Sequence, residues 1–149
     1  MGNVVRGLLA GTVLSAAAVG LTLGLPPAAL AEGAIAIGAS GDFAKDGFAF
    51  GAAINKSSAD DAGQAALSTC KKYEGAPKMA AICKVVFHFS HECYALSFDP
   101  KPGTPGVGWA IAEDKETAEE RANRNCQVTA GPDRRDFCKV NQSFCDSEN

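Results

Sequence analysis

Apolar and polar residues alternate in several short stretches of this chain, and small apolar residues recur four positions apart in two longer ones. Alternation is typical of β-strands, whereas a spacing of four places side chains on one face of a helix. The patterns predict strands at residues 34–37, 48–52, 83–90, 94–98, 107–111 and from 138 onward, and helices at residues 62–70 and 118–126. The order strand, strand, helix, strand therefore occurs twice.

The two copies also share the positions of their cysteines. In each copy, one cysteine ends the helix, one opens the next strand and one follows that strand: Cys70, Cys83 and Cys93 in the first copy, and Cys126, Cys138 and Cys145 in the second. We therefore expect an α+β fold that is stapled by disulfides. In it, two ββαβ pseudo-repeats, divided near Cys93, form a mainly antiparallel sheet with two helices packed on it.

The strand patterns also predict which side chains share a face. Strict alternation over residues 83–90 places Val85 on the same face as Phe87 and Phe89. Residues 99–106 are rich in proline and glycine, and they lie between two strand-like stretches. This segment therefore predicts the loop of a long hairpin.

The predicted helices have capping residues but bury little. Ser57 or Ser58 can cap the first helix and Asp114 the second, because their side chains accept hydrogen bonds from a first turn. The apolar stripe of each helix consists of alanine and cysteine, so the buried area per residue is small. Because the buried apolar area is small, covalent cross-links would contribute substantially to the stability of the domain.

The cysteines predict disulfides rather than a metal site. Their number is even, and no two are spaced as closely as the ligands of a zinc knuckle or ribbon. The most local pairing that respects the repeat joins each helix end to the next strand, as Cys70–Cys83 and Cys126–Cys138. Cys93 and Cys145 then remain, and we expect their bond to cross-link the two halves of the molecule.

Residues 1–31 have the three parts of a secretory signal peptide: a start with one arginine, an uncharged stretch at residues 7–25, and Ala-Leu-Ala before the cleavage point. The alternative is an uncleaved membrane anchor, for which this stretch is long enough. Its glycines and its well-placed cleavage sequence favour cleavage. We therefore expect residues 32–149 to form a single domain that is periplasmic or secreted and has no stable membrane insertion.

Residues with metal-binding or acid–base chemistry are sparse. The two histidines, His88 and His91, lie just before Glu92, and together they are the candidates for a small metal or acid–base site. Residues three apart on a strand face opposite sides, so both imidazoles reach one ion only if the chain turns near Ser90. We predict no catalytic, cofactor-binding or metal-binding residue and no cofactor. The alternative function is a small periplasmic hydrolase or metal-dependent enzyme around these residues.

An isoelectric point near 5.3 argues against a nucleic-acid partner, which usually requires a basic surplus. Aromatic residues are the better indication of function. Phe43, Phe48 and the loop before Trp109 could form a recognition surface, since aromatic side chains dominate contact hot spots; the alternative is that they fill a small core. We therefore expect a non-catalytic binding or interaction module whose partner is another protein or an envelope component. Its role would lie in the envelope, in enzyme inhibition or against a host.

The order of these motifs resembles the bacterial secreted family called domain of unknown function 4189. The resemblance rests on an Ala-Ile-Ala strand at residue 34, an alanine-rich helix ending at Cys70, the Cys-Lys-Val-Val strand at Cys83 and the Cys-Tyr-Ala strand at Cys93. It covers residues 33 to 145. This chain departs from the family in its last motif, Gln-Ser-Phe-Cys in place of Trp-x-Cys, and in a long loop at residues 74–81. The resemblance implies a bacterial exported protein and supplies no reaction.

Signal cleavage gives the first prediction. The protein recovered outside the cytoplasm should begin at Glu32 when its N-terminus is sequenced, because the peptidase inspects the small residues Ala29 and Ala31. Recovery of a chain that begins at Met1 in a membrane fraction would contradict it.

Overall fold

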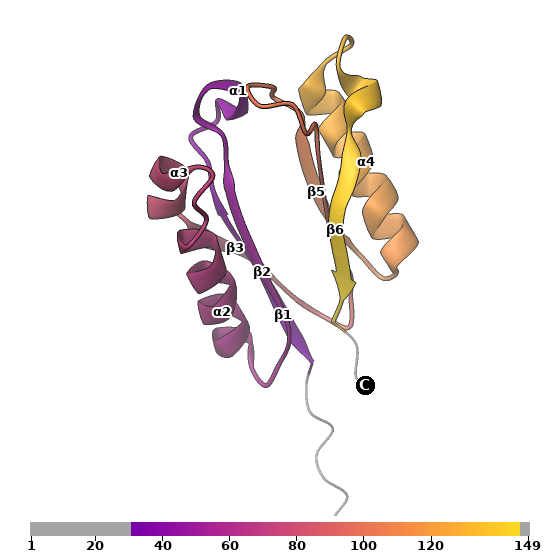
Figure 1. Cartoon of the computed structure of the whole chain (residues 1–149). Coiled ribbons are helices and arrows are strands. Elements are labelled where there is room, and N and C mark those ends of the chain that lie inside the picture. The colour runs from indigo at the N-terminus through magenta and orange to yellow at the C-terminus, as the bar shows by residue number, and fades with distance from the viewer. Residues whose placement is uncertain (1–30, 147–149) are drawn as a thin grey trace, which may run out of the picture.

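Two units of the same topology follow one another along the chain in the computed structural model, which describes residues 31–146 (Figure 1). The elements are β1 (Glu32–Gly38), α1 (Phe43–Asp46), β2 (Ala49–Lys56), α2 (Ala59–Lys71), α3 (Pro77–Ala81), β3 (Lys84–Ser90), β4 (Cys93–Phe98), β5 (Val107–Ala112), α4 (Lys115–Ala130), a short 3-10 helix η1 (Arg135–Phe137) and β6 (Lys139–Cys145). The predicted signal peptide lies outside the described residues, apart from Ala31. No helix among the described residues is long and apolar enough to cross a membrane.

Each unit forms its own antiparallel sheet with its first strand in the centre. The strand order is β2-β1-β3 in the first sheet and β5-β4-β6 in the second. The α+β class and the repeated ββαβ order are therefore confirmed, but the six strands form two sheets of three instead of one sheet. A short turn after β3, where His91 has a φ of 57°, carries the chain from one sheet to the other.

The two sheets stack face to face, and the long helices cover their outer faces (Figure 1). The layer between the sheets holds the large apolar side chains. Its buried members are Ile35, Phe50, Phe89, Tyr94, Leu96 and Val107. Stacking explains the presence of two sheets, because each sheet has one large apolar face that its own helix does not cover.

The outer faces are built from small residues that let each helix lie close to its sheet. Alanines and a cysteine of α2 pack on alanines of β1 and β2, and α4 packs in the same way on β4 and β5. Gly51 of β2 faces the backbone of α2, and a Cβ there would collide with the carbonyl oxygen of Ala66. Gly108 of β5 stands in the same relation to α4, where a Cβ would meet the backbone nitrogen of Cys126.

A β-bulge in β3 reverses part of the predicted facing. The register with β1 shifts between the pairs Ile35–Phe87 and Ala36–Val85, so Val86 is an extra residue. Val85 therefore faces α2, whereas Phe87 and Phe89 face the other sheet. The prediction of one common face from strict alternation was wrong, because an extra residue in a bulge moves the side chains after it to the opposite face of the sheet.

Residues 74–81, expected as a long loop, contain the helix α3. Pro77 occupies its first turn, where the missing N–H of proline costs nothing. Met79 and Ala80 are buried against the small residues under α2. The two longer helices are capped as predicted, since Ser58 Oγ accepts from Asp61 N at 3.1 Å and Asp114 Oδ1 accepts from Thr117 N at 2.8 Å.

The structure joins the cysteines as Cys70–Cys83, Cys126–Cys138 and Cys93–Cys145. The first two tie a helix end to the next strand. The third joins residues that are directly opposite each other on β4 and β6, within the second sheet. The expectation that it cross-links the two halves is therefore wrong, because Cys93 is the first residue of β4 and belongs to the second unit.

A hydrogen bond between the two units lies at the opposite end from α1. Asn55 is at an irregularity of β2 with a φ of 54°, and its N–H donates to Asp146 Oδ1 at 2.6 Å. Asp146 is 1% exposed, and its own N–H donates to the carbonyl of Glu92 at 2.8 Å. Asp146, the residue after β6, is thus hydrogen-bonded both to the end of β2 and to the turn between the sheets.

The close helix contacts predict that a single methyl group at either strand glycine disturbs the fold. Gly51→Ala and Gly108→Ala should each lower the free energy of unfolding by about 1–3 kcal/mol, because the helix backbone must move away from the sheet. Urea denaturation followed by circular dichroism measures the loss.

Gly75→Ala is the matched control. The three atoms nearest to a Cβ at Gly75 all belong to the exposed ring of Tyr73, which can turn aside. Its stability should therefore stay within about 0.5 kcal/mol of the wild type. Equal losses in all three variants would contradict the close-packing argument.

Candidate functional site

A pocket of about 570 Å³ lies between the two sheets, and we call it the inter-sheet pocket. Its apolar wall comes from β1, α1, β2, β4 and β5, with the side chains of Ile37, Phe43, Phe48, Phe50, Leu96, Val107, Trp109 and Ile111. Its polar rim comes from α4 alone, with Arg121, Arg124, Asn125 and Thr129. The volume falls within the range of ligand sites in proteins.

The predicted aromatic residues meet in this wall. Phe43 and Phe48 pack edge to face with 6.2 Å between ring centroids, and Phe48 packs in the same way on Phe98 at 6.1 Å. Trp109 lies against Phe87 of the first sheet at 4.9 Å. Phe43, Phe48 and Trp109 are each only partly buried, so these rings both pack between the sheets and border the pocket.

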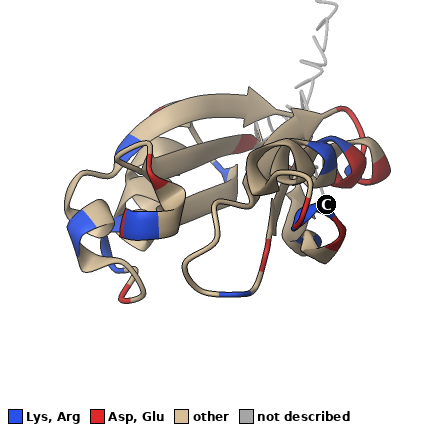
Figure 2. Ribbon diagram, turned by 90° about the horizontal axis from the view of Figure 1, so that it is seen from above, with Lys and Arg blue, Asp and Glu red and all other residues tan. Residues whose placement is uncertain are grey.

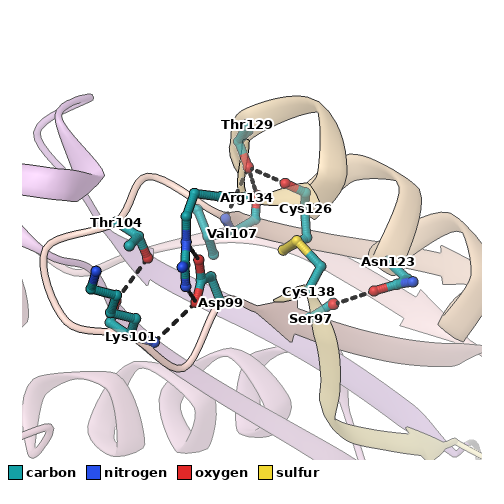
Figure 3. Close-up of a disulfide and its surroundings, with 10 residues drawn as sticks. All are labelled: Ser97, Asp99, Lys101, Thr104, Val107, Asn123, Cys126, Thr129, Arg134 and Cys138. Carbon is teal, nitrogen blue, oxygen red and sulfur yellow. Dashed lines mark hydrogen bonds and ion pairs between the residues drawn. A yellow bond between two sulfur atoms is a disulfide. The ribbon is translucent and has the colours of Figure 1, made fainter. Parts of the chain in front are cut away.

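Residues of the pocket rim bond to part of the free edge of β5. The side-chain amide of Asn125 donates to the carbonyl of Trp109 at 2.9 Å. Thr129 Oγ1 accepts from the N–H of Val107 at 2.9 Å and lies 2.7 Å from its carbonyl oxygen (Figure 3). These bonds occupy backbone groups that an edge strand would otherwise offer to an added strand.

The two arginines of the rim are in different electrostatic situations. Arg124 Nη2 donates to Glu120 Oε1 at 2.7 Å, the i,i+4 pair that the helix pattern favours. Arg121 forms no ion pair within residues 31–146. Figure 2 shows basic and acidic segments side by side along α4. The Arg121 guanidinium therefore retains its hydrogen-bonding capacity at the mouth of the pocket.

The second unit differs from the first at the positions that form this site. When the sequences of α2 and α4 are aligned so that Cys70 matches Cys126, Arg121 and Arg124 correspond to Ala65 and Ser68 of α2. When the strand glycines are aligned, Trp109 corresponds to Ala52 of β2. Our sequence reasoning paired Arg124 with Glu120, but it did not single out Arg121 and assigned neither arginine to a site. Aligning the two repeats residue by residue would have revealed them.

Two further hollows border the same aromatic cluster. One of about 740 Å³ lies along β2 and β6, and one of about 380 Å³ lies between α1 and the 99–106 loop. Phe48 lines both of them as well as the inter-sheet pocket. Tyr94 of β4 donates its hydroxyl hydrogen to Gln142 Oε1 of β6 at 3.0 Å. Burial raises the pKa of Tyr94 to about 12.

An ion pair holds the 99–106 loop in place next to the pocket (Figure 3). Arg134 contacts both carboxylate oxygens of Asp99 at 2.8 Å, and the Asp99 side chain has no exposed surface. The loop backbone adds a bond from Lys101 N to Asp99 Oδ1 at 3.0 Å. The hydrogen bonds from Arg134 hold the pKa of Asp99 at about 2, well below its usual range.

The predicted histidine candidates lie away from the pocket. His88 is exposed on β3 and faces Gly63 of α2, while His91 is exposed in the turn before Glu92. The two imidazoles thus lie on different elements of the chain. Within residues 31–146, no group of three or more histidine, cysteine or acidic residues is arranged to hold a metal ion.

The ion pair predicts a pH-dependent stability. Asp99→Asn should be less stable than the wild type near neutral pH, where the carboxylate is charged. A carboxyl pKa lowered on folding stabilises the fold above the unfolded value of about 3.9, and the contribution disappears as the pH falls toward about 2. The stability gap should therefore narrow between neutral pH and pH of about 2, as measured by denaturant midpoints.

The exposed Asp133 provides the control for this series. Asp133→Asn should leave the midpoint close to that of the wild type throughout. If the denaturant midpoints of the wild type and Asp99→Asn differ by the same amount at neutral pH and at low pH, the ion pair is not the cause of the difference in stability.

Comparison with known proteins identifies the family. No curated protein matches the sequence. Among solved structures, the NMR structure of Rv1813c from Mycobacterium tuberculosis is similar, with 19% identity, a TM-score of 0.44 and coverage of 96% of this chain and 99% of that chain. The family described as "Domain of unknown function (DUF4189)" matches residues 33–145, from the first strand of the first unit to the last strand of the second. As the order of its motifs predicts, the chain therefore belongs to the DUF4189 family.

Proposed function

We propose that this protein is an exported, non-catalytic binding module that takes up an apolar ligand, or an apolar part of a larger partner, in the inter-sheet pocket. The observation that carries the proposal is the apolar wall of that pocket, with three partly exposed aromatic rings in it. Aromatic side chains offer a large contact area and lose little conformational entropy on binding.

The position of the pocket supports a role in binding. Protein interiors are packed with few voids, because each unit of apolar surface left in contact with water forgoes about 25 cal/mol per Å². Here a pocket of about 570 Å³ opens at the edge of the main apolar layer, beside exposed residues of α4. A ligand that fills it would bury surface that the fold leaves open.

Two features support export. The described chain has three disulfides and no free cysteine, as is typical of domains that work in an oxidising compartment. The sequence before Glu32 has the order of a signal peptide. Both agree with a place of action in the envelope or outside the cell.

The single tryptophan of the chain is a built-in reporter for this proposal, since Trp109 lies in the pocket wall. Titration of the disulfide-bonded protein with 1-decanol, an uncharged apolar probe, should shift the Trp109 emission along a saturable curve. Ile37→Phe adds volume to the opposite wall and should weaken this binding by about tenfold or more, because the probe loses contact area worth more than 1 kcal/mol.

Val128→Phe is the matched control, because Val128 is 77% exposed on α4 and does not line the pocket. It should bind the probe as the wild type does. The proposal fails if the wild type shows no saturable change, or if Ile37→Phe binds with wild-type affinity.

A further inference from the structure

We infer that the ligand of the inter-sheet pocket is an amphipathic anion, a small molecule with an apolar body and one carboxylate or phosphate group, and that Arg121 binds the anionic group. This inference rests on the proposed function and adds the charge and polarity of the ligand. It follows from four features of the pocket, each independent of its volume.

The charge of the pocket is opposite to that of the chain. The sequence has a formal net charge of −3, yet the charged residues that line the pocket are both arginines. No aspartate or glutamate is among its lining residues. An apolar wall beside cationic groups suits a ligand that carries an apolar body and a negative group.

The two arginines point to one binding group. Glu120 already contacts Arg124 Nη2 in an i,i+4 ion pair, whereas Arg121 forms no ion pair within the described part of the chain. A guanidinium presents several N–H donors in a planar fork that matches a carboxylate or phosphate with two parallel bonds. Arg121 is therefore the rim arginine whose positive charge no carboxylate of the described residues already neutralises.

The partly occupied edge of β5 argues against an extended peptide as the ligand. A peptide that binds by strand addition needs free backbone groups along the edge. Asn125 and Thr129 already bond to the backbone of Trp109 and Val107 at this edge. A peptide that paired along this part of the edge would have to displace these bonds, which favours a ligand that binds through its own apolar body.

The repeat provides an internal comparison. Both units need the same glycine and small helix residues to build their sheets, and both have them at Gly51 and Gly108. The ring of Trp109 and the charge of Arg121 have no counterpart in the first unit, where Ala52 and Ala65 stand. A unit with the same topology forms without these two residues, so the strand and helix arrangement within a unit does not require them.

The test compares three probes with the same ten-carbon chain, each below the concentration at which it forms micelles: decanoate, decyl phosphate and 1-decanol. Trp109 emission follows binding to the intact, disulfide-bonded protein. Decanoate or decyl phosphate should bind about tenfold more tightly than 1-decanol, as expected for one charge-assisted hydrogen-bonded pair. The stronger of the two anions identifies the headgroup as carboxylate or phosphate.

Variants at Arg121 separate charge from packing. Arg121→Gln should weaken binding of the anions by about tenfold, so that they bind no more tightly than 1-decanol does, while Arg121→Lys should restore part of the preference. Arg135→Gln is the matched control, because Arg135 is an exposed arginine in η1 that does not line the pocket. It should bind all three probes as the wild type does.

The outcomes distinguish the two proposals. If 1-decanol binds as tightly as the anions and Arg121→Gln changes nothing, the ligand is not an anion, and the apolar pocket remains the binding site. If no probe shifts Trp109 emission along a saturable curve, the proposed function itself fails. If Arg135→Gln lowers anion affinity as much as Arg121→Gln does, the attraction comes from overall charge and the assignment to Arg121 is overturned.

Discussion

Burial of one large apolar sheet face against another is the interaction on which the rest of this structure depends. Each three-stranded sheet is closed on one side by its helix, through alanine, glycine and cysteine. Its other side carries Ile, Leu, Phe and Tyr, which a single unit would expose to water. The second unit supplies the missing cover, so each half of the chain completes the fold of the other. The same layer contains the inter-sheet pocket, and stability and binding therefore draw on one set of side chains.

The residues of this fold are divided by size. Small side chains lie under the helices, where they permit close approach but contribute little buried area, and large ones lie between the sheets. The disulfides Cys70–Cys83 and Cys126–Cys138 act where burial is weakest, since each anchors a helix to the strand that follows it. Cross-links thus add to the attachment of helices whose own apolar stripes bury little area.

The sequence predicts local features better than relations between distant segments. The helix caps at Ser58 and Asp114 and the repeated strand order follow from nearby residues. The stacking of two sheets could not be predicted from the sequence. Alternation shows that a strand has an apolar face, but it does not show which element covers that face. The bulge at Val86 left no mark in the pattern, and it moved Phe87 to the inner face. Arg121 was overlooked because an exposed helix arginine is ordinary until a pocket lies beside it.

The placement of the disulfides gives the two units unequal resistance to proteases. The second unit is a closed covalent loop from Cys93 to Cys145, so a cut within the exposed residues 100–103 leaves both fragments attached. The first unit has no cysteine before Cys70, and β1, its central strand, precedes every cross-link. A single cut between β1 and β2 would therefore leave the strand that joins β2 to β3 held by hydrogen bonds and packing alone. In a protease-rich surrounding, the lifetime of the protein depends on that short connection.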